Sequence, residues 1–166
     1  NDTAYYDGKL AIKSIADLKK LASAGNPFFF AIGFRLPHLP WNAPKKYYDL
    51  YDSVNIAGNR YTPIDLPKQV TNSKELLEYG RTEHYNTDEF HHEARHAYYA
   101  CVSYIDEQIG LVLQALKDLG LDKNTIVVLL GDHGWHLGEH NFWGKHNILD
   151  NALHVPLIIK VPGMKP

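Results

Sequence analysis

The chain has 166 residues, about the length of one domain with one hydrophobic core. Its 45 % hydrophobic and 22 % charged residues are typical of a globular protein, and a net charge of -2 gives no electrostatic reason to expect nucleic acid or an anionic membrane as a partner. The single cysteine, Cys101, excludes an intrachain disulfide, and every apolar run is shorter than the about 20 residues that a membrane helix needs.

The first elements in the chain are a helix and a strand. Ser14 is expected to cap a short amphipathic helix, IADLKKLASAG, that ends at Gly25. The run FFFAIGF at 28–34 has no polar alternation, which predicts a strand buried on both faces of a parallel sheet. Three prolines in RLPHLPWNAP exclude a helix interior or a central strand, so we expect His38 on a loop at the end of that strand.

The middle of the chain combines a polar segment with a long helix. Residues 52–86 are rich in Tyr, Pro, Asn and charge, which predicts a surface excursion, preceded by a short helix near KKYYDLY. From 87 to 119 apolar residues recur three or four apart, which predicts a long helix that ends at Gly120. TIVVLLGD and VPLIIKVPG are then two further buried strands. Their order around the helix predicts an α/β fold with a mostly parallel sheet flanked by helices.

Polar side chains follow the predicted strands where ligands bind in such sheets, outside the carboxyl ends of the strands. His38 follows one strand and the loop GDHGWHLGEHNFWGKHN follows the next, so we expect both at the same edge. Asp132 and His133 offer a carboxylate oxygen and an imidazole nitrogen to a divalent cation, although an Asp at a strand end is about as often only a turn former. Lys145 at the same edge would suit a tetrahedral anion.

Two features of this loop have alternative interpretations. His133, His136 and His140 are spaced three and four apart, so zinc is a second candidate metal, but Gly134 and Gly138 weaken any helix there. For His136 and His140 we favour ordinary surface histidines. The Trp135 ring is a candidate to stack on a sugar, and hydrophobic packing explains that tryptophan and Trp143 at least as well.

Four blocks in this order resemble the sulfatase family, most of all its iduronate-2-sulfatase-like branch: PFFFAIGFRLPHLPW, YYACVSYIDEQIG, GDHGWHLGEHNFWGKH and HVPLIIKVPG. The resemblance implies an alkaline-phosphatase-like fold that hydrolyses sulfate esters with a formylglycine nucleophile beside a calcium ion. On this resemblance Asp132 and His133 match calcium ligands. Lys145 matches the lysine that contacts the sulfate, and His38 matches the histidine that binds sulfate and protonates the leaving oxygen.

The chain departs from the family pattern. The Cys-x-Pro-x-Arg motif is absent, and Cys101 lies in ACVSY, at a helix-core position. The family's N-terminal Asp pair and the lysine-histidine pair that also binds the sulfate are missing too. We therefore expect residues 1–166 to be part of one sulfatase catalytic domain. The formylglycine and the other half of the calcium ligands would lie in a missing N-terminal part, so that this chain alone is inactive. The resemblance implies a sulfated sugar or glycosaminoglycan as substrate and the rest of the sulfatase chain as partner, in a periplasmic, secreted or lysosomal location.

Two other functions stay open on the residues alone. A phosphoesterase of the same fold would also need a metal, a lysine and a histidine around a tetrahedral anion, and its nucleophile segment would distinguish it. The other possibility is a sulfatase-like domain retained for binding or structure rather than catalysis.

Overall fold

The computed structural model describes residues 1–54, 56, 87–139 and 142–164. Among them, residues 1–54, 96–127 and 160–164 form a first compact unit, and 56, 87–95, 128–139 and 142–159 form a second. The expected excursion at 52–86 lies outside the described residues apart from 52–54 and 56. None of the helices in the described ranges is long and apolar enough to cross a bilayer.

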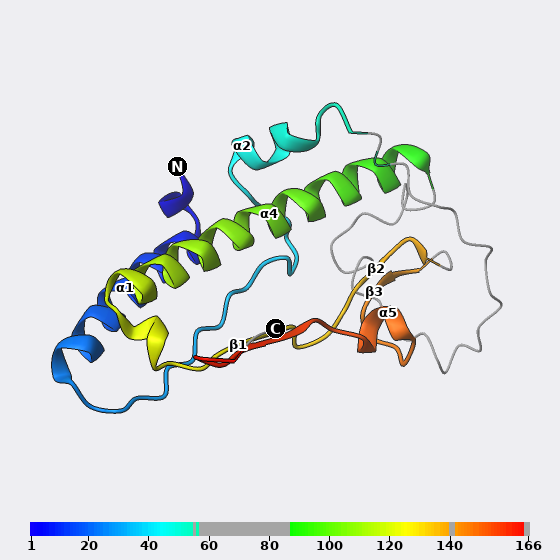
Figure 1. Cartoon of the computed structure of the whole chain (residues 1–166). Helices are drawn as coiled ribbons and strands as arrows, with labels where there is room; N and C mark the ends of the chain where they lie inside the picture. Colours follow the sequence, from blue (N-terminus) through cyan, green and yellow to red (C-terminus); the bar gives the residue numbers. More distant parts are fainter. Residues whose placement is uncertain (55, 57–86, 140–141, 165–166) are drawn as a thin grey trace. The chain divides into compact units, whose positions relative to one another are not determined.

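The first unit is built from helices that Figure 1 labels α1, α2 and α4. Its elements are η1 (Asp2–Ala4), α1 (Tyr6–Ala24), α2 (Lys45–Tyr48), η2 (Asp49–Tyr51), the C-terminal part of α4 (Asp88–Asp118) and η3 (Leu121–Lys123). The long helix, its end near Gly120 and the short helix at KKYYDLY are confirmed.

The start of α1 differs from the prediction, although its end does not. Gly25 ends the helix with a φ of 69°, in the left-handed region that glycine adopts easily. Ser14, however, is buried in the middle of α1 and does not cap it. The buried face of the helix begins in its first turn and comprises Asp7, Gly8, Ala11, Ser14 and Leu18. This spacing of three and four residues continues through Ser14, so the helix begins well before it.

Residues 28–34 pack on the helices but do not form the predicted strand. Every second side chain, Phe28, Phe30, Ile32 and Phe34, contacts the core that α1 and α4 build from Ala11, Leu18, Val112 and Leu116. Phe29, which points the other way, is 95 % exposed. Within the described residues no backbone hydrogen bond places this segment in a ladder. The prediction of a strand buried on both faces is therefore wrong for this chain, since only one face is covered.

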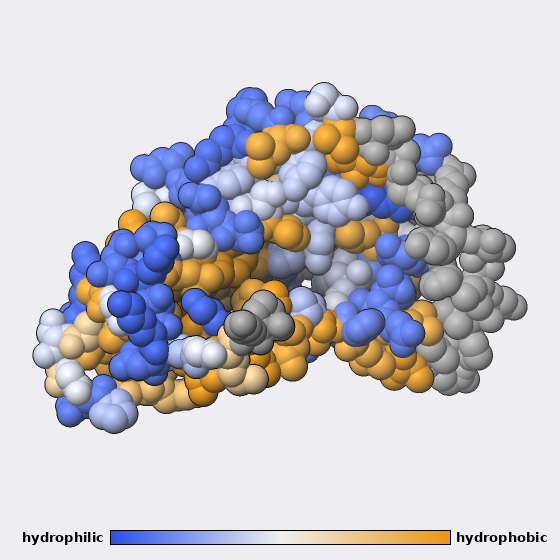
Figure 2. All heavy atoms as spheres, viewed as in Figure 1, coloured by the Kyte–Doolittle hydropathy of each residue, from blue (hydrophilic) through white to orange (hydrophobic). Residues whose placement is uncertain are grey.

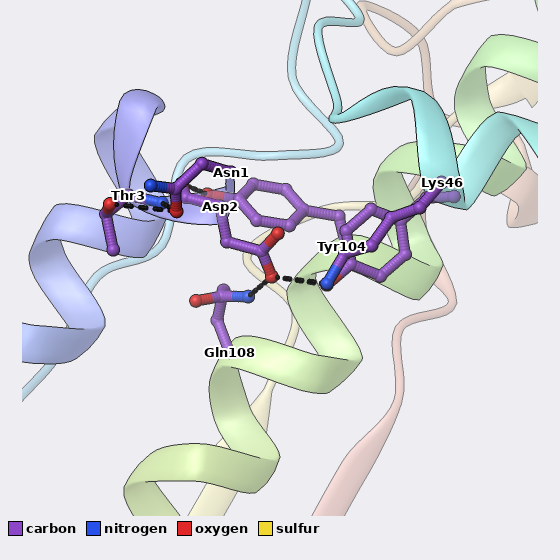
Figure 3. Close-up of polar contacts among 7 residues, drawn as sticks. Asn1, Asp2, Thr3, Lys46, Tyr104 and Gln108 are labelled. Carbon is purple, nitrogen blue, oxygen red and sulfur yellow. Dashed lines mark hydrogen bonds and ion pairs between the residues drawn. The ribbon is translucent and has the colours of Figure 1, made fainter.

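Asp2 joins three elements of the first unit, as Figure 3 shows. Its carboxylate accepts hydrogen bonds from the Tyr47 hydroxyl (2.6 Å), the Lys46 ammonium (3.0 Å) and the Gln108 amide (3.2 Å). Burial acts to raise the pKa of Asp2, but these hydrogen bonds and the charge of Lys46 outweigh it and hold the pKa below its usual value. The carboxylate thus fixes the start of the chain against α2 and α4.

The second unit contains a hairpin and a short strand pair (Figure 1). Strand β2 (His136–Leu137) pairs with β3 (Trp143–Gly144) in antiparallel register, with His136 opposite Gly144. The one-turn helix α5 (Asp150–Leu153) follows, and β1 (Val127–Leu130) pairs with β4 (Leu157–Lys160).

The β1–β4 pair is antiparallel rather than parallel. Gly131, directly after β1, donates its backbone N–H to the carbonyl of Pro156, directly before β4, at 3.1 Å. The end of β1 therefore lies beside the beginning of β4. The prediction that these two strands are parallel is wrong, because the hairpin and α5 keep the connection at one end of the pair, whereas parallel neighbours need a crossover to the opposite end.

The side chains of this pair are exposed, although both strands were predicted to be buried. The exposed apolar residues are Val128, Leu129, Leu130, Leu157, Ile158 and Ile159. They belong to both faces of the pair, since successive side chains of a strand point to opposite sides. Figure 2 shows hydrophobic surface where these two strands lie. Within the described residues neither face of the pair is fully covered.

Candidate active site

His38 lies on a tightly bonded loop, as predicted. The backbone N–H of His38 donates to the carbonyl of Arg35 at 3.0 Å, which closes a turn. The Trp41 indole N–H then donates to the carbonyl of Pro37 at 2.9 Å, and the Tyr48 hydroxyl donates to the carbonyl of Trp41 at 2.8 Å. These bonds tie the loop to itself and to α2.

The ring of His38 has a defined tautomer. Its Nδ1 lies 2.7 Å from the carbonyl oxygen of Leu39. Because a carbonyl only accepts, Nδ1 carries the hydrogen, and proton exchange takes place at Nε2. The Arg35 guanidinium donates to the same carbonyl at 3.4 Å. A histidine whose orientation and tautomer are set by backbone contacts is suited to general acid or base chemistry.

A buried carboxylate that the sequence did not identify holds this loop. Asp7, in the first turn of α1, is 2 % exposed and accepts from the backbone N–H groups of Arg35 (2.8 Å) and Leu36 (3.2 Å). An acidic residue in the first turn of a helix is expected there for the helix dipole, so its type and position give no sign of a partner 28 residues away.

Asp132 and His133 follow β1 and lie next to each other. Asp132 is 88 % exposed, and its Oδ2 is 3.4 Å from Nε2 of His133. Nδ1 of His133 donates to the carbonyl of Gly134 at 2.9 Å, which leaves the Nε2 lone pair on the side of the carboxylate. A carboxylate oxygen and an imidazole nitrogen so placed can bind one cation.

The turn after this pair requires its glycine. Gly134 donates its N–H to the carbonyl of Ala152 at 2.8 Å, and a Cβ at Gly134 would lie 2.0 Å from the carbonyl oxygen of Asn151. The close approach fixes Asp132 and His133 against α5. The glycine of the Asp-His-Gly pattern is therefore required because a larger residue would clash with α5.

A calcium site would need more ligands than these two donors. Calcium takes six to eight oxygen ligands, and in the described parts of the chain no cluster of three or more His, Cys, Asp or Glu side chains could hold a metal ion. The exposed Asp132 carboxylate and the orientation of His133 fit one side of such a site. The remaining ligands would have to come from elsewhere.

Lys145 and Trp135 are brought together in the second unit. The ammonium of Lys145 lies 5.7 Å from the centroid of the Trp135 ring, within the range of a cation–π contact. Trp135 is buried, and Lys145 is half-buried. The indole thus helps to hold the ammonium beside the hairpin, whereas the ring itself has little surface to offer a sugar.

His136 is a core residue and not the surface histidine that we predicted. It is fully buried on β2, edge-on to Phe142 with ring centroids 5.1 Å apart, and its Nε2 lies 3.3 Å from Oδ1 of Asn147. The prediction failed because the hairpin turns this side chain inward. His136 is in a strand, so the spacing of the three histidines does not place them on one helix face; His140 lies outside the described residues.

The N-terminal part of α4 holds the hairpin through two buried polar side chains. The Arg95 guanidinium donates to the carbonyl of Leu137 at 2.9 Å and lies 5.8 Å from the Trp143 ring. The Trp143 indole N–H donates to Nε2 of His91 at 3.3 Å. Trp143 is therefore a packing residue, and α4 fixes the element that precedes Lys145.

The predicted site residues are divided between the two units. His38 belongs to the first, whereas Asp132, His133, Lys145 and Trp135 belong to the second. Their meeting at one edge therefore stays a prediction. Cys101, by contrast, is resolved as a core residue, because burial, with a smaller contribution from the charge of Asp7, raises the pKa of its thiol to about 12.

Comparison with known proteins identifies the family. The family model described as Sulfatase matches residues 2–166. The chain belongs to the sulfatase family. Mouse iduronate 2-sulfatase is 37 % identical over 162 residues, which cover 91 % of this sulfatase chain and 29 % of the mouse protein. A sulfatase of Formosa agariphila is 39 % identical over 142 residues, which cover 83 % of the chain and 28 % of that protein.

A solved structure shows the same fold over the whole sulfatase chain. The phosphonate monoester hydrolase of Silicibacter pomeroyi superposes with a TM-score of 0.81 and 28 % identity, and the alignment covers 100 % of this chain and 34 % of the hydrolase. The alkaline-phosphatase-like fold class predicted from the sequence is thereby confirmed. The chain spans about a third or less of the length of these relatives.

Proposed function

We propose that this chain belongs to a sulfuric ester hydrolase that acts on a sulfated sugar. It would supply His38 as the general acid and Lys145 as a positively charged side chain that binds the sulfate. The observation that carries the proposal is the His38 ring, whose tautomer is set by the carbonyl of Leu39. The family match and the 37 % identity to an iduronate 2-sulfatase support the reaction class. The activity belongs to the full-length protein rather than to these 166 residues by themselves.

His38 would donate its proton to the departing sugar oxygen. In the protonated ring Nδ1–H is bonded to Leu39, so the proton given to the ester oxygen comes from Nε2. After transfer, the neutral ring is the tautomer that the Leu39 carbonyl already binds. The ring therefore needs no reorientation during the step.

Lys145 would bind the non-bridging oxygens of the sulfate. Its ammonium is half-buried beside the Trp135 ring, where a positive charge is screened less than in bulk water. A charge held in place before the reaction stabilises the negative charge of the transition state without reorganisation. Trp135 would act mainly by holding Lys145, and direct contact with a sugar is the weaker of its two proposed roles.

Asp132 and His133 would provide part of a calcium site. When bound, the cation would supply positive charge beside the sulfate group. Cys101 is not suited to become the formylglycine nucleophile. Its thiol is fully buried, and the residues after it do not form the motif from which formylglycine is made. The nucleophile would therefore come from another part of the full-length protein, and we place that protein outside the cytosol, where sulfated glycans occur.

The test is sulfate release from a sulfated uronic-acid disaccharide by the full-length protein as its source organism makes it. The Lys145→Ala variant should lower the rate about a hundredfold, as loss of a charged transition-state contact typically does. The matched control is Lys13→Ala, which removes an exposed lysine bound to Asp17 in α1. Equal rates for Lys145→Ala and the wild type would refute the role of Lys145.

The second candidate function is phosphoryl or phosphonyl ester hydrolysis. It is favoured by the superposition with a phosphonate monoester hydrolase over the whole chain. An aryl phosphate and an aryl phosphonate assayed beside the sulfated disaccharide separate the two. Phosphate or phosphonate release without sulfate release would replace our proposal, and no release from any of the three would favour a non-catalytic sulfatase-like domain.

A further inference from the structure

Both carboxylate oxygens of Asp7 are used to hold two consecutive residues of the His38 loop. Oδ1 accepts from the N–H of Arg35 at 2.8 Å and Oδ2 accepts from the N–H of Leu36 at 3.2 Å. The contact joins the first turn of α1 to the point where segment 28–34 becomes the loop. A carboxylate that binds two successive amides sets both the position and the direction of the chain at that point.

Arg35 connects this anchor to His38 in two ways. Its carbonyl accepts the backbone N–H of His38 at 3.0 Å. Its guanidinium donates at 3.4 Å to the Leu39 carbonyl, which is the same atom that binds Nδ1 of His38. The backbone and the ring of His38 are therefore both linked to Arg35, whose own backbone N–H is bound by Asp7.

The carboxylate is costly in this location. Asp7 is 2 % exposed, and its charge contributes, after burial, to raising the pKa values of Cys101 and Tyr104 to about 12. Burial of a charge carries a desolvation cost that two hydrogen bonds to amides often do not outweigh. An apolar side chain at the same place would typically make the fold at least as stable. The two hydrogen bonds to the His38 loop give a structural reason for a carboxylate at this position.

We propose that Asp7 is a positioning residue for His38, which keeps the imidazole in the orientation and tautomer needed for proton donation. The inference rests on the proposed role of His38. Asn at this position offers one acceptor oxygen and places an NH₂ group against a backbone N–H, so Asp7→Asn loses one bond with little change in volume. Asp7→Ala loses both bonds.

The activity test compares two sulfate esters in the full-length protein. One is a sugar sulfate, whose alkoxide leaving group needs protonation, and the other is 4-nitrophenyl sulfate, whose leaving group does not. We expect Asp7→Asn to lower turnover of the sugar sulfate about tenfold and Asp7→Ala about a hundredfold, with a much smaller loss on the aryl ester. The ratio of the two rates is independent of how much of each variant is folded.

Asp2→Asn is the matched control. Asp2 is a carboxylate of the same unit that is partly rather than fully buried. It accepts hydrogen bonds from Lys46 and Gln108 (Figure 3) and from Tyr47, and none of these residues lies in the His38 loop. It should lower stability without changing the rate ratio. An unchanged ratio in both Asp7 variants would overturn the inference even if sulfate release by the wild type is normal.

A second readout does not depend on activity. The amides of Arg35 and Leu36 should exchange with solvent faster in both Asp7 variants, and the ¹⁵N shifts of the His38 ring should change from those of an Nδ1–H tautomer to a mixture. Neither should change in Asp2→Asn. If the wild type releases no sulfate, the proposed function fails, and these spectra alone decide whether Asp7 positions His38; spectra that match the wild type would contradict it.

Discussion

The backbone N–H of Gly131 donates to the carbonyl of Pro156 at 3.1 Å, so β1 and β4 lie side by side and run in opposite directions. The pair exposes apolar side chains on both faces, among them Leu130 at 62 % and Leu157 at 61 %. Exposed strands of this kind associate with other apolar surfaces or with other strands. This surface has a measurable consequence.

The 166-residue chain produced by itself should bind an apolar dye such as ANS and self-associate. The double variant Val128→Thr/Ile158→Thr keeps β-branched residues but removes apolar surface, and it should reduce both effects. Dye fluorescence and sedimentation velocity are the measurements, and a matched Ser23→Thr change in exposed α1 serves as the control. A monomeric chain without dye binding would contradict the exposure of the β1–β4 pair.

The alkaline stability of the first unit should depend on Cys101 and Tyr104. Burial is the main reason that their pKa values rise from 9.0 and 10.0, respectively, to about 12. The folded state binds these protons more tightly than the unfolded state. Their contribution to stability is therefore complete below about pH 9 and is lost as the pH rises from 9 towards 12.

Denaturant midpoints of the full-length protein at pH 8, 10 and 11 measure this effect. We expect the midpoint to fall across the series and to fall less steeply in Cys101→Val and Tyr104→Phe, because neither substitute titrates. Tyr99→Phe, on the exposed side of α4, is the matched control and should keep the wild-type slope. Identical slopes in all variants would contradict the burial of these two groups.

Calcium affinity should depend on Asp132. Its exposed carboxylate lies 3.4 Å from the imidazole of His133, so removal of one donor leaves the other insufficient to hold the ion. We expect Asp132→Ala to weaken calcium binding by the full-length protein at least about tenfold in isothermal titration. Asp118→Ala, an exposed aspartate of α4 bonded to Gln114, is the control. Unchanged affinity would remove Asp132 from the proposed ligand set.

The helices were more predictable than the strand pairing. The apolar stripe of α4 and the glycines that end α1 and α4 are local signals, and the structure places them where the spacing predicts. The direction of β4 depends on how the hairpin and α5 route the chain, which no local pattern records. Residues 28–34 are apolar on both sides, yet only one side meets a helix.

The sequence pointed to the candidate site residues by their type, but not to the residues that hold them in place. His38, Asp132, His133 and Lys145 stand out because titratable groups follow apolar runs. Asp7 and Arg95 do not, since each holds a segment far away in the sequence, at a distance of 28 and 42 residues. The burial of His136 was missed for the same reason, because a histidine in a polar loop gives no sign that a hairpin will enclose it.

The role of His38 as the general acid is tested most directly by how far the His38→Ala substitution lowers turnover of esters with different leaving groups. Turnover of a sugar sulfate and of 4-nitrophenyl sulfate by the full-length protein would be compared with the wild type, with His92→Ala, an exposed histidine of α4, as the control. We predict a loss of about a hundredfold or more on the sugar sulfate and a much smaller loss on the aryl sulfate, because only the former needs a proton. Equal losses on both esters, or none, would contradict the role of His38 as the general acid.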